Sequence, residues 1–164
     1  MIRPASAADR AAVVALADRL ADFELPPGRT AREIQVADHH LFDAQFAAPS
    51  PDVLFLVAEE DGEVLGTIFV NTRSDYFTRA TVAYVEVLAV SETAAGKGIG
   101  RALMAETEGW ARARGLSRVE LAVFANNRRA RAFYEHLGYQ AETMRYVKQL
   151  GGERPQGRGS PERA

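Results

Sequence analysis

The sequence contains no cysteine among its 164 residues. A disulfide framework, a thiolate nucleophile and a thiolate-bound metal are therefore excluded. The chain also lacks any run of the roughly 18 apolar residues that a membrane-spanning helix needs. No signal-peptide pattern opens it, so we expect a cytoplasmic protein without membrane contact. An excess of positive charge is missing too. The formal net charge is −2, which argues against a nucleic-acid partner because such partners require a basic surface.

What is present is the composition of an ordinary globular protein, with 47% hydrophobic and 26% charged residues. A chain of this length is about one domain and can bury a sizeable core. We expect a single domain over residues 1–149. From Gly151 on, the chain is rich in Gly, Pro and Arg, and we expect residues 150–164 to form a disordered tail.

Hydrophobic periodicity and turn signals predict the element order β-α-α-β-β-β-α-β-α-β. Capping-box spacings that begin at Ser6 and Thr30 mark the starts of the first two helices. Asp61-Gly62 predicts a tight hairpin between the second and third strands. The expected strands cover residues 1–5, 52–60, 63–72, 81–90, 117–124 and 139–150. The expected fold class is α/β (α+β), with a mixed, mostly antiparallel sheet flanked by helices.

The run SETAAGKGIGR at residues 91–101 links the apolar strand before it to a helix. Gly96, Gly98 and Gly100 allow the backbone to approach a ligand closely and to adopt positive φ. The first N–H groups of the helix are unpaired, and the helix dipole favours an anion there. The run therefore indicates a phosphate-binding loop, although glycines that only permit a tight turn would leave the same pattern.

Two familiar nucleotide motifs do not fit this run. A Walker loop requires Ser or Thr after the lysine, whereas Lys97 is followed by Gly98. In a dinucleotide fingerprint the third glycine would fall on Arg101 or Leu103, depending on the start. The phosphate must therefore belong to another kind of ligand.

The strand VEVLAV, the glycine loop, the helix, the next strand and the run N-x-x-A-x-x-F-Y-E-H-L-G-Y at residues 127–139 together resemble the GNAT superfamily of acetyl-CoA-dependent N-acetyltransferases. The resemblance covers about residues 1–149. It implies acetyl-CoA as co-substrate and a GNAT-like sheet whose fourth and fifth strands splay apart. The family loop reads Q/R-x-x-G-x-G/A. Gly98 and Gly100 match it, whereas Ala95 stands where Gln or Arg is usual, which removes one side-chain contact to the diphosphate.

The resemblance implies two catalytic residues. Glu86, in an apolar strand, is the candidate general base, acting through water on the substrate ammonium. The alternative is a strand carboxylate that points to the open end of a split sheet or pairs with an arginine. Tyr134 falls on the tyrosine of the family's last helix and is the candidate acid for the leaving sulfur. Its alternative is a core side chain, because it shares a helix face with other apolar residues.

The resemblance also implies a coenzyme site with backbone, loop and helix-start contributions. Asn127 is expected to contact the pantetheine arm and to cap its helix. The backbone of the fourth strand is expected to pair with pantetheine amides like an added strand. The candidate cofactor-binding residues are Leu88, Val90, Gly96, Lys97, Gly98, Ile99, Gly100, Arg101 and Asn127. We expect no metal site, since the histidine pair at 39–40 lacks partners at a suitable spacing.

The function that the resemblance implies is direct transfer of acetyl from acetyl-CoA to a primary amine in a ternary complex. The acceptor would be a small molecule, an amino acid or a peptide N-terminus, bound between the first two helices and the loop at residues 74–80. Asp22, Glu24 and Asp75 would offer it negative charge. Tyr76 and Phe77 would form an aromatic wall or a homodimer contact. The alternatives are a CoA-binding regulatory module without turnover, which Ala95 favours, and an interaction domain with no affinity for CoA.

Overall fold

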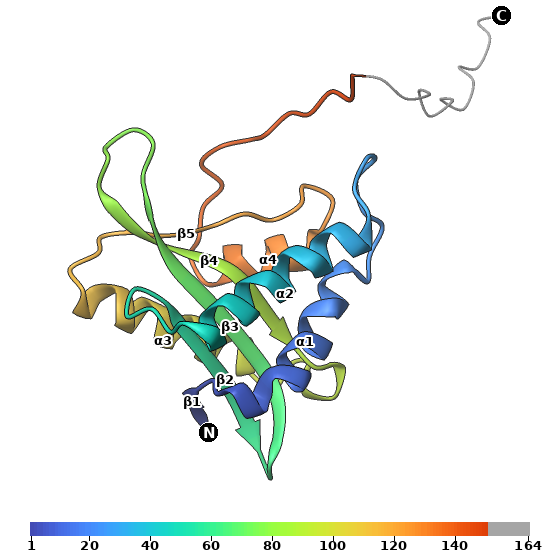
Figure 1. Cartoon of the computed structure of the whole chain (residues 1–164). Coiled ribbons are helices and arrows are strands. Elements are labelled where there is room, and N and C mark those ends of the chain that lie inside the picture. Colours follow the sequence, from blue (N-terminus) through green and yellow to red (C-terminus); the bar gives the residue numbers. More distant parts are fainter. Residues whose placement is uncertain (151–164) are drawn as a thin grey trace, which may run out of the picture.

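The structure is a computed structural model that describes residues 1–150 (Figure 1). Five strands form one sheet in the order β1-β2-β3-β4-β5, antiparallel except for the parallel pair β4 and β5. The strands are β1 (Ile2–Pro4), β2 (Leu54–Glu60), β3 (Glu63–Ser74), β4 (Thr81–Val90) and β5 (Val119–Leu121). The α-helices are α1 (Arg10–Asp18), α2 (Ala31–Ala47), α3 (Ile99–Ala113) and α4 (Arg128–His136). Short 3₁₀ turns are η1 (Ala7–Asp9), η2 (Arg19–Ala21) and η3 (Glu92–Ala94). The expected α+β class and mostly antiparallel sheet are confirmed.

Both predicted capping boxes form. The Ser6 N–H donates to the Asp9 carboxylate at 2.8 Å, and the Thr30 N–H donates to Glu33 at 2.9 Å. The Glu33 N–H returns a hydrogen bond of 3.2 Å to the Thr30 hydroxyl. Asp9 also accepts two hydrogen bonds of 2.8 Å from Arg3. The first helical turn is therefore attached to β1 as well as capped.

The predicted hairpin joins β2 to β3. Asp61 has φ 51° and Gly62 has φ 82°. Positive φ at both central residues is the geometry of a two-residue turn that matches the twist of its strands.

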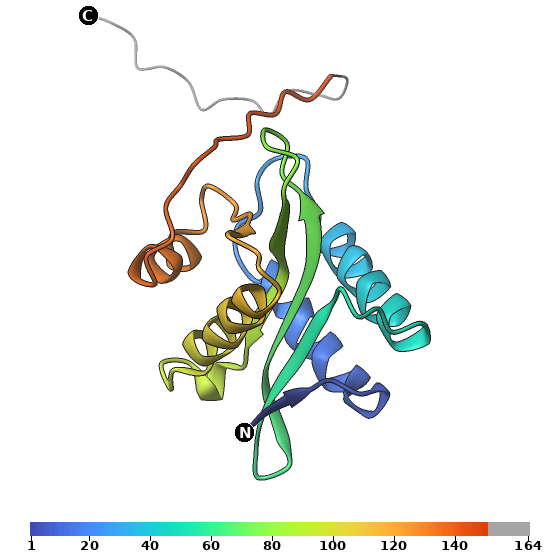
Figure 2. The same cartoon turned by 90° about the vertical axis from the view of Figure 1, so that its left-hand side faces the viewer.

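The sheet separates two helical layers, which Figure 2 shows with the sheet seen nearly edge-on. The layer of α1 and α2 packs on one face through an aromatic cluster in which Phe42 stacks on Phe55 with ring centroids 5.2 Å apart. The layer of α3 and α4 packs on the other face, where Leu103 and Met104 are fully buried. The two layers have separate hydrophobic cores, and the central strands contribute to both.

The prediction of a last strand over residues 139–150 is wrong. In the structure these residues form no helix or strand and lead away from the sheet after α4 (Figure 1). The fifth predicted strand, 117–124, is also reduced to the three residues of β5. The alternation of apolar and β-branched residues gives a segment the propensity for a strand, but a ladder also needs a neighbouring strand to supply hydrogen bonds.

Within residues 1–150, no helix has the length and apolar character needed to cross a membrane. The expected disordered tail lies, from residue 151 on, outside the described residues.

Candidate active site

Glu86 lies in an irregularity of the β3–β4 ladder. Phe69 is opposite Val87 and Val70 is opposite Val85, so Glu86 is the extra residue on β4. A bulge of this kind redirects the side chain of the extra residue. It lets Glu86 and its neighbour Val87 both contact groups on the α1–α2 side of the sheet, where Val87 joins the aromatic core.

Two side chains of β3 hold the Glu86 carboxylate. The Asn71 amide donates to Oε1 at 2.7 Å, and the Arg73 guanidinium forms an ion pair with the same oxygen. The Glu86 side chain is only 14% exposed. The arginine-paired arrangement considered from the sequence is thus present, and Arg73 is itself held 3.6 Å above the Tyr84 ring. Within residues 1–150 both donors use Oε1, which leaves Oε2 available to another partner.

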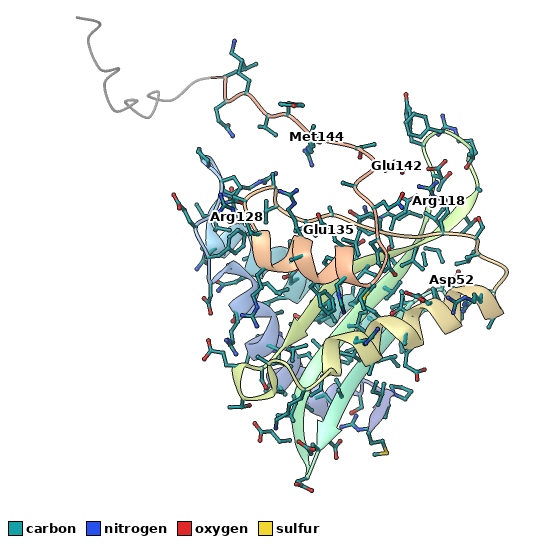
Figure 3. All side chains as sticks on the ribbon, turned by 180° about the vertical axis from the view of Figure 1, so that it is seen from behind. Asp52, Arg118, Arg128, Glu135, Glu142 and Met144 are labelled. Carbon is teal, nitrogen blue, oxygen red and sulfur yellow. The ribbon has the colours of Figure 1, made fainter. Side chains whose placement is uncertain are left out.

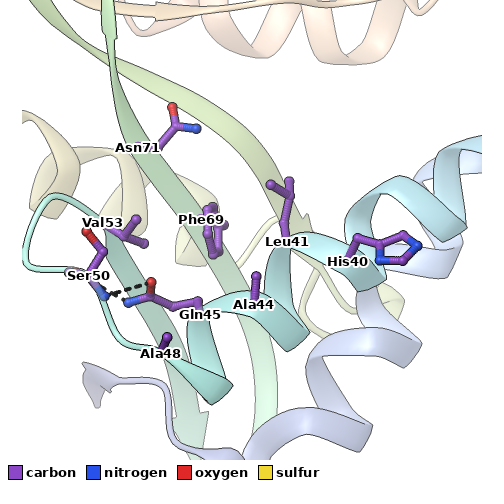
Figure 4. A pocket seen from close by; sticks show the side chains of 9 residues that line it. All are labelled: His40, Leu41, Ala44, Gln45, Ala48, Ser50, Val53, Phe69 and Asn71. Atoms are coloured by element: carbon purple, nitrogen blue, oxygen red, sulfur yellow. Dashed lines mark hydrogen bonds between the residues drawn. The ribbon is translucent and has the colours of Figure 1, made fainter.

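A pocket of about 360 Å³ lies between α2 and the sheet, and Asn71, which binds Glu86, is one of its lining residues (Figure 4). Its walls are mostly apolar, and Asn71 and Phe69 of β3 face Leu41 of α2 across it. Away from Asn71, hydrogen bonds between Gln45 and Ser50 tie α2 to the chain that follows it. The lining residues are His40, Leu41, Ala44, Gln45, Ala48, Ser50, Val53, Phe69 and Asn71. Asn71 therefore belongs both to the wall of the pocket and to the hydrogen-bond partners of Glu86.

Two buried oxygens near Glu86 have no hydrogen-bond donor among the described residues, namely Asp38 Oδ2 and Asn71 Oδ1. Burial raises the pKa of the Asp38 carboxyl to about 6, and the negative charges of Glu86 and Asp18 add to the rise, while His39 opposes it. Buried acceptors without donors are costly. These two oxygens therefore offer unused acceptor capacity next to Glu86.

β4 and β5 separate next to Glu86. Their ladder begins at Ala83–Val119 and ends at Val85–Leu121. Beyond it, β4 continues through Leu88 and Val90, which have no strand partner on the β5 side among residues 1–150. The predicted splaying of the fourth and fifth strands is thus observed, and this stretch of β4 backbone can accept an added strand.

The glycine run lies at the end of this opening and leads into α3. Gly98 is the N-cap residue with φ 81°, and Gly96 has φ 80°. A Cβ at either position would meet no atom within 4 Å. The first intrahelical hydrogen bond runs from the Ala102 N–H to the Gly98 carbonyl. Among residues 1–150 the N–H groups of Ile99, Gly100 and Arg101 have no backbone acceptor before the helical pattern begins, as an anion site requires, whereas the Lys97 N–H already donates to the Ala94 carbonyl.

The other residues of the run have different surroundings. Lys97 and Arg101 are exposed, and Lys97 Nζ lies 3.8 Å from Glu60 Oε2. A Cβ on Gly100 would lie 3.2 Å from the Phe133 ring. Gly100 thus allows α3 to pack closely against α4, a role that the sequence pattern did not reveal.

Tyr134 lies on the other face of the sheet from Glu86, in the α3–α4 layer. Its ring packs edge-on against Phe133 at 5.1 Å and Tyr139 at 5.9 Å. Burial raises the pKa of the Tyr134 phenol to about 12. Asn127 caps α4, as predicted, by accepting a hydrogen bond of 3.0 Å from the Ala130 N–H.

Some residues expected near the acceptor are engaged elsewhere. Asp75 accepts hydrogen bonds of 2.6 Å from the Thr78 N–H and hydroxyl, so it stabilises the β3–β4 loop. His39, from the histidine pair considered above for a metal site, contacts Asp18 at 2.7 Å. Within residues 1–150 no group of three or more potential ligands could hold a metal ion.

Sequence reasoning missed Asn71, Arg73 and Asp38. Asn71 and Arg73 follow Phe69 at intervals of two residues along β3, so strand periodicity could have predicted that all three side chains lie on one face. Asp38 is three residues before Leu41 and four before the buried Phe42 on α2, which marks it as a polar residue on an inward face. Neither pattern indicates that all three lie near Glu86.

The family model described as "Acetyltransferase (GNAT) family" matches residues 17–139. Mycothiol acetyltransferase of Beutenbergia cavernae is 40% identical over 90 residues, which are 54% of this chain and 29% of that enzyme. Aminoalkylphosphonate N-acetyltransferase of Salmonella typhimurium is 30% identical over 115 residues, covering 69% of this chain and 75% of the relative. Among solved structures, a putative acetyl transferase from Pyrococcus furiosus superposes with a TM-score of 0.74 at 24% identity, over 92% of this chain and 99% of that one.

Proposed function

We propose that this chain, which belongs to the GNAT family of acetyltransferases, transfers acetyl from acetyl-CoA directly to a primary amine held beside Glu86. The family uses acetyl-CoA as the donor. The observation that carries the proposal is the β4 bulge, because it puts a nearly buried carboxylate between the pocket under α2 and the unpaired stretch of β4.

The residues on the other side of this carboxylate fit the coenzyme. The space at Gly96 and Gly98 and the free N–H groups at the start of α3 suit a diphosphate. The unpaired backbone at Leu88 and Val90 suits an amide-containing arm, which would hydrogen-bond like an extra strand. The proposed set is completed by Lys97, Ile99, Gly100, Arg101 and Asn127. When bound, acetyl-CoA supplies an activated acetyl thioester.

Glu86 would accept the proton that the substrate ammonium must lose before it can act as a nucleophile. Asn71 and Arg73 orient the carboxylate through Oε1 and leave Oε2 for the amine or an intervening water. Tyr134 would donate a proton to the departing sulfur. Because burial raises its pKa to about 12, its phenol keeps the proton at neutral pH.

The acceptor proposed here is a primary amine on an apolar body. Its ammonium group carries three N–H donors. Asp38 Oδ2 and Asn71 Oδ1 are unused buried acceptors close to Glu86, so they can share these donors with the base. The apolar part would occupy the pocket lined by Leu41 and Phe69.

A panel of amines tests this proposal through the release of free CoA thiol. We expect amine-dependent release, with kcat/KM at least roughly tenfold higher for a primary amine bearing a compact apolar group than for an equally long polar amine. Tertiary amines serve as the control because they cannot yield a stable amide. Thiol release that ignores the amine added would contradict the acceptor assignment, and coenzyme binding without any release would favour the regulatory module that Ala95 suggested.

A further inference from the structure

Asp38 on α2 is a carboxyl that the fold leaves partly unused. Its Oδ2 is buried and has no hydrogen-bond donor among residues 1–150. Asp43, five residues further along the same helix, is in contrast held by Arg10 through hydrogen bonds of 2.6 and 2.9 Å. A buried acceptor without a donor destabilises a fold, so its presence calls for an explanation. A ligand that brings the missing donor is one such explanation.

The surroundings of Asp38 are mostly negative. Burial is the main reason that the pKa of its carboxyl rises to about 6, and the charges of Glu86 and Asp18 raise it further, while His39 lowers it. His39 lies 2.7 Å from Asp18 and is thus paired with that carboxylate. At pH 8 the Asp38 carboxyl is ionised, because this pH is above its pKa. A second negative charge therefore acts near the proposed base.

The pocket next to Asn71 offers little to an anion. Its nine lining residues, all within the described part of the chain, include no lysine or arginine, and its one histidine, His40, is exposed. The Asn71 amide already donates to Glu86 at 2.7 Å, and the Gln45 amide to the Ser50 carbonyl at 3.4 Å. The buried Oδ1 of Asn71 is an acceptor without a donor. The pocket therefore suits a group that donates hydrogen bonds.

The arginines of the surrounding elements are paired or lie elsewhere. Arg32 of α2 is exposed and six residues before Asp38, a spacing that puts it on another side of the helix. Figure 3 shows Arg118 before β5 and Arg128 at the start of α4, and Arg118 pairs with Glu142 at 2.6 Å. The arginines of α1, η2 and β3 each pair with a carboxylate, namely Arg10 with Asp43, Arg19 with Glu92 and Arg73 with Glu86.

We propose that Asp38 is a specificity-determining residue that restricts the acceptor to amines without a carboxylate on the carbon next to the nitrogen. The proposal rests on the proposed function. An ammonium beside Glu86 supplies three N–H donors to the buried acceptors and is attracted by both carboxylates. A carboxylate one carbon away would be repelled by the same two charges, and such repulsion discriminates strongly between ligands. The acceptor class is thus a simple amine with a compact apolar group, and free amino acids are excluded.

Three matched acceptors test this restriction on the wild-type enzyme. Leucine, leucinamide and 3-methylbutylamine have the same branched apolar group and carry a carboxylate, a carboxamide or a hydrogen next to the amine. We expect kcat/KM for thiol release at pH 8 to be at least roughly tenfold higher for leucinamide and 3-methylbutylamine than for leucine. The carboxamide has the size of the carboxylate without its charge. If leucine and leucinamide are equally poor acceptors, exclusion is by size and the proposal is overturned.

Asp38→Asn removes the charge and keeps the shape of the side chain. It should reduce the ratio of kcat/KM between leucinamide and leucine by roughly tenfold, as expected when a repulsive contact is lost. Comparing this ratio between two enzymes cancels the different basicities of the two amines. Asp43→Asn, at an exposed aspartate on the same helix, is the matched control and should keep the wild-type ratio. Circular dichroism checks that both variants fold.

An Asp38→Asn ratio equal to that of wild type would overturn the proposal, and so would a ratio that Asp43→Asn reduces equally. Equal kcat/KM for leucine and leucinamide in the wild type would overturn this restriction alone, because acetyl transfer itself would still occur. If none of the three amines releases thiol, the proposed function fails and the restriction fails with it. The two failures are therefore distinguished by whether any thiol appears.

Discussion

At the scale of single residues, the environment of Glu86 shows how a strand can present a carboxylate from within an apolar run. The bulge turns it toward Asn71 and Arg73, which fix one of its oxygens. A charged group that is 14% exposed needs such partners. The same partners orient it for proton transfer, so its structural and proposed chemical roles do not conflict.

Glu86→Gln should lower kcat/KM by about 100-fold or more, because the amide keeps the shape of the side chain but cannot accept the ammonium proton. The loss should be largest at low pH, where more of the amine is protonated. Steady-state rates over a range of pH check this. Glu63→Gln, at the exposed β2–β3 hairpin, is the control for the substitution type. If the pH–rate profile of Glu86→Gln equals that of wild type, the proton leaves by another route.

Tyr134→Phe preserves the packing with Phe133 and Tyr139 and removes only the hydroxyl. If Tyr134 donates a proton to the sulfur, Tyr134→Phe should lower the single-turnover rate about 100-fold or more and leave the affinity for CoA unchanged. Tyr139→Phe, whose hydroxyl contacts Glu108 at 3.3 Å, is the matched control. A Tyr134→Phe enzyme with a wild-type single-turnover rate would restrict Tyr134 to the core.

Because of the buried Asp38 carboxyl, we expect the stability of the fold to depend on pH in an unusual way. Burial raises its pKa in the folded state to about 6, from an ordinary value near 3.8. A raised pKa stabilises the fold most below the unfolded pKa, and that contribution is lost as the pH rises through about 6. The Tm of Asp38→Asn relative to that of wild type should therefore increase as the pH rises from 4.5 to 7.5, which a series of thermal melts measures.

Asp43→Asn, on the same helix, is the control for this experiment. The hydrogen bond from Arg10 lowers the pKa of the Asp43 carboxyl, so its contribution is present at neutral pH and disappears as the pH falls. Between pH 4.5 and 7.5 the Tm difference between Asp43→Asn and wild type should thus stay constant, because this carboxyl, whose ordinary pKa is near 3.8, is ionised in both the folded and the unfolded state there. An equally constant Tm difference for Asp38→Asn would show that Asp38 is not buried as an ionisable group.

At the scale of elements, the start of α3 is the proposed phosphate site, and Gly98 tests it. Gly98→Val puts a branched side chain into the open space in front of the helix. It should raise the Kd for CoA by roughly tenfold or more and remove the thermal stabilisation by CoA, which is about 2.7 kcal/mol at 100 times Kd for a one-site ligand. Calorimetry and thermal shift check both effects.

Gly62→Val is the matched control, because Gly62 has φ 82° against 81° for Gly98 and its Cβ would also meet no atom within 4 Å. Both variants therefore suffer the same backbone strain, but only one lies at the helix start. Gly100 is a poor probe, since a Cβ there would press on Phe133. Unchanged CoA affinity in Gly98→Val would move the phosphate site elsewhere.

The elements that the sequence predicted well are those defined by local chemistry. Capping boxes at Ser6 and Thr30, the Asp61-Gly62 turn and the apolar run of β4 each contain their own signal. The bulge at Glu86 has no such signal, because an extra residue is defined only by the register with β3. Pairing of Glu86 with an arginine was predicted only as an alternative, and that the arginine is Arg73 follows from the register.

At the scale of the whole molecule, the sheet divides the proposed chemistry between its two faces. Glu86, Asn71 and the pocket are on the α1–α2 side, and Tyr134 is in the α3–α4 layer. The β4–β5 ladder ends at Val85–Leu121, which leaves a gap in the strand pairing beyond it. The family resemblance predicted this gap from the sequence. The missing sixth strand could not be foreseen, because residues 139–150 have the pattern of a strand, whereas pairing also requires that the folded chain place a neighbouring strand beside them.

The initial rate of thiol release, measured while acetyl-CoA and a primary amine are both varied, tests the central claim most directly. Direct transfer requires both substrates to be bound together, with no acetylated enzyme between them. We predict release that depends on the amine, with double-reciprocal lines that intersect and with a lower rate for Glu86→Gln at every substrate concentration. Parallel lines, the sign of a covalent acetyl-enzyme, or release that does not depend on the amine would contradict it.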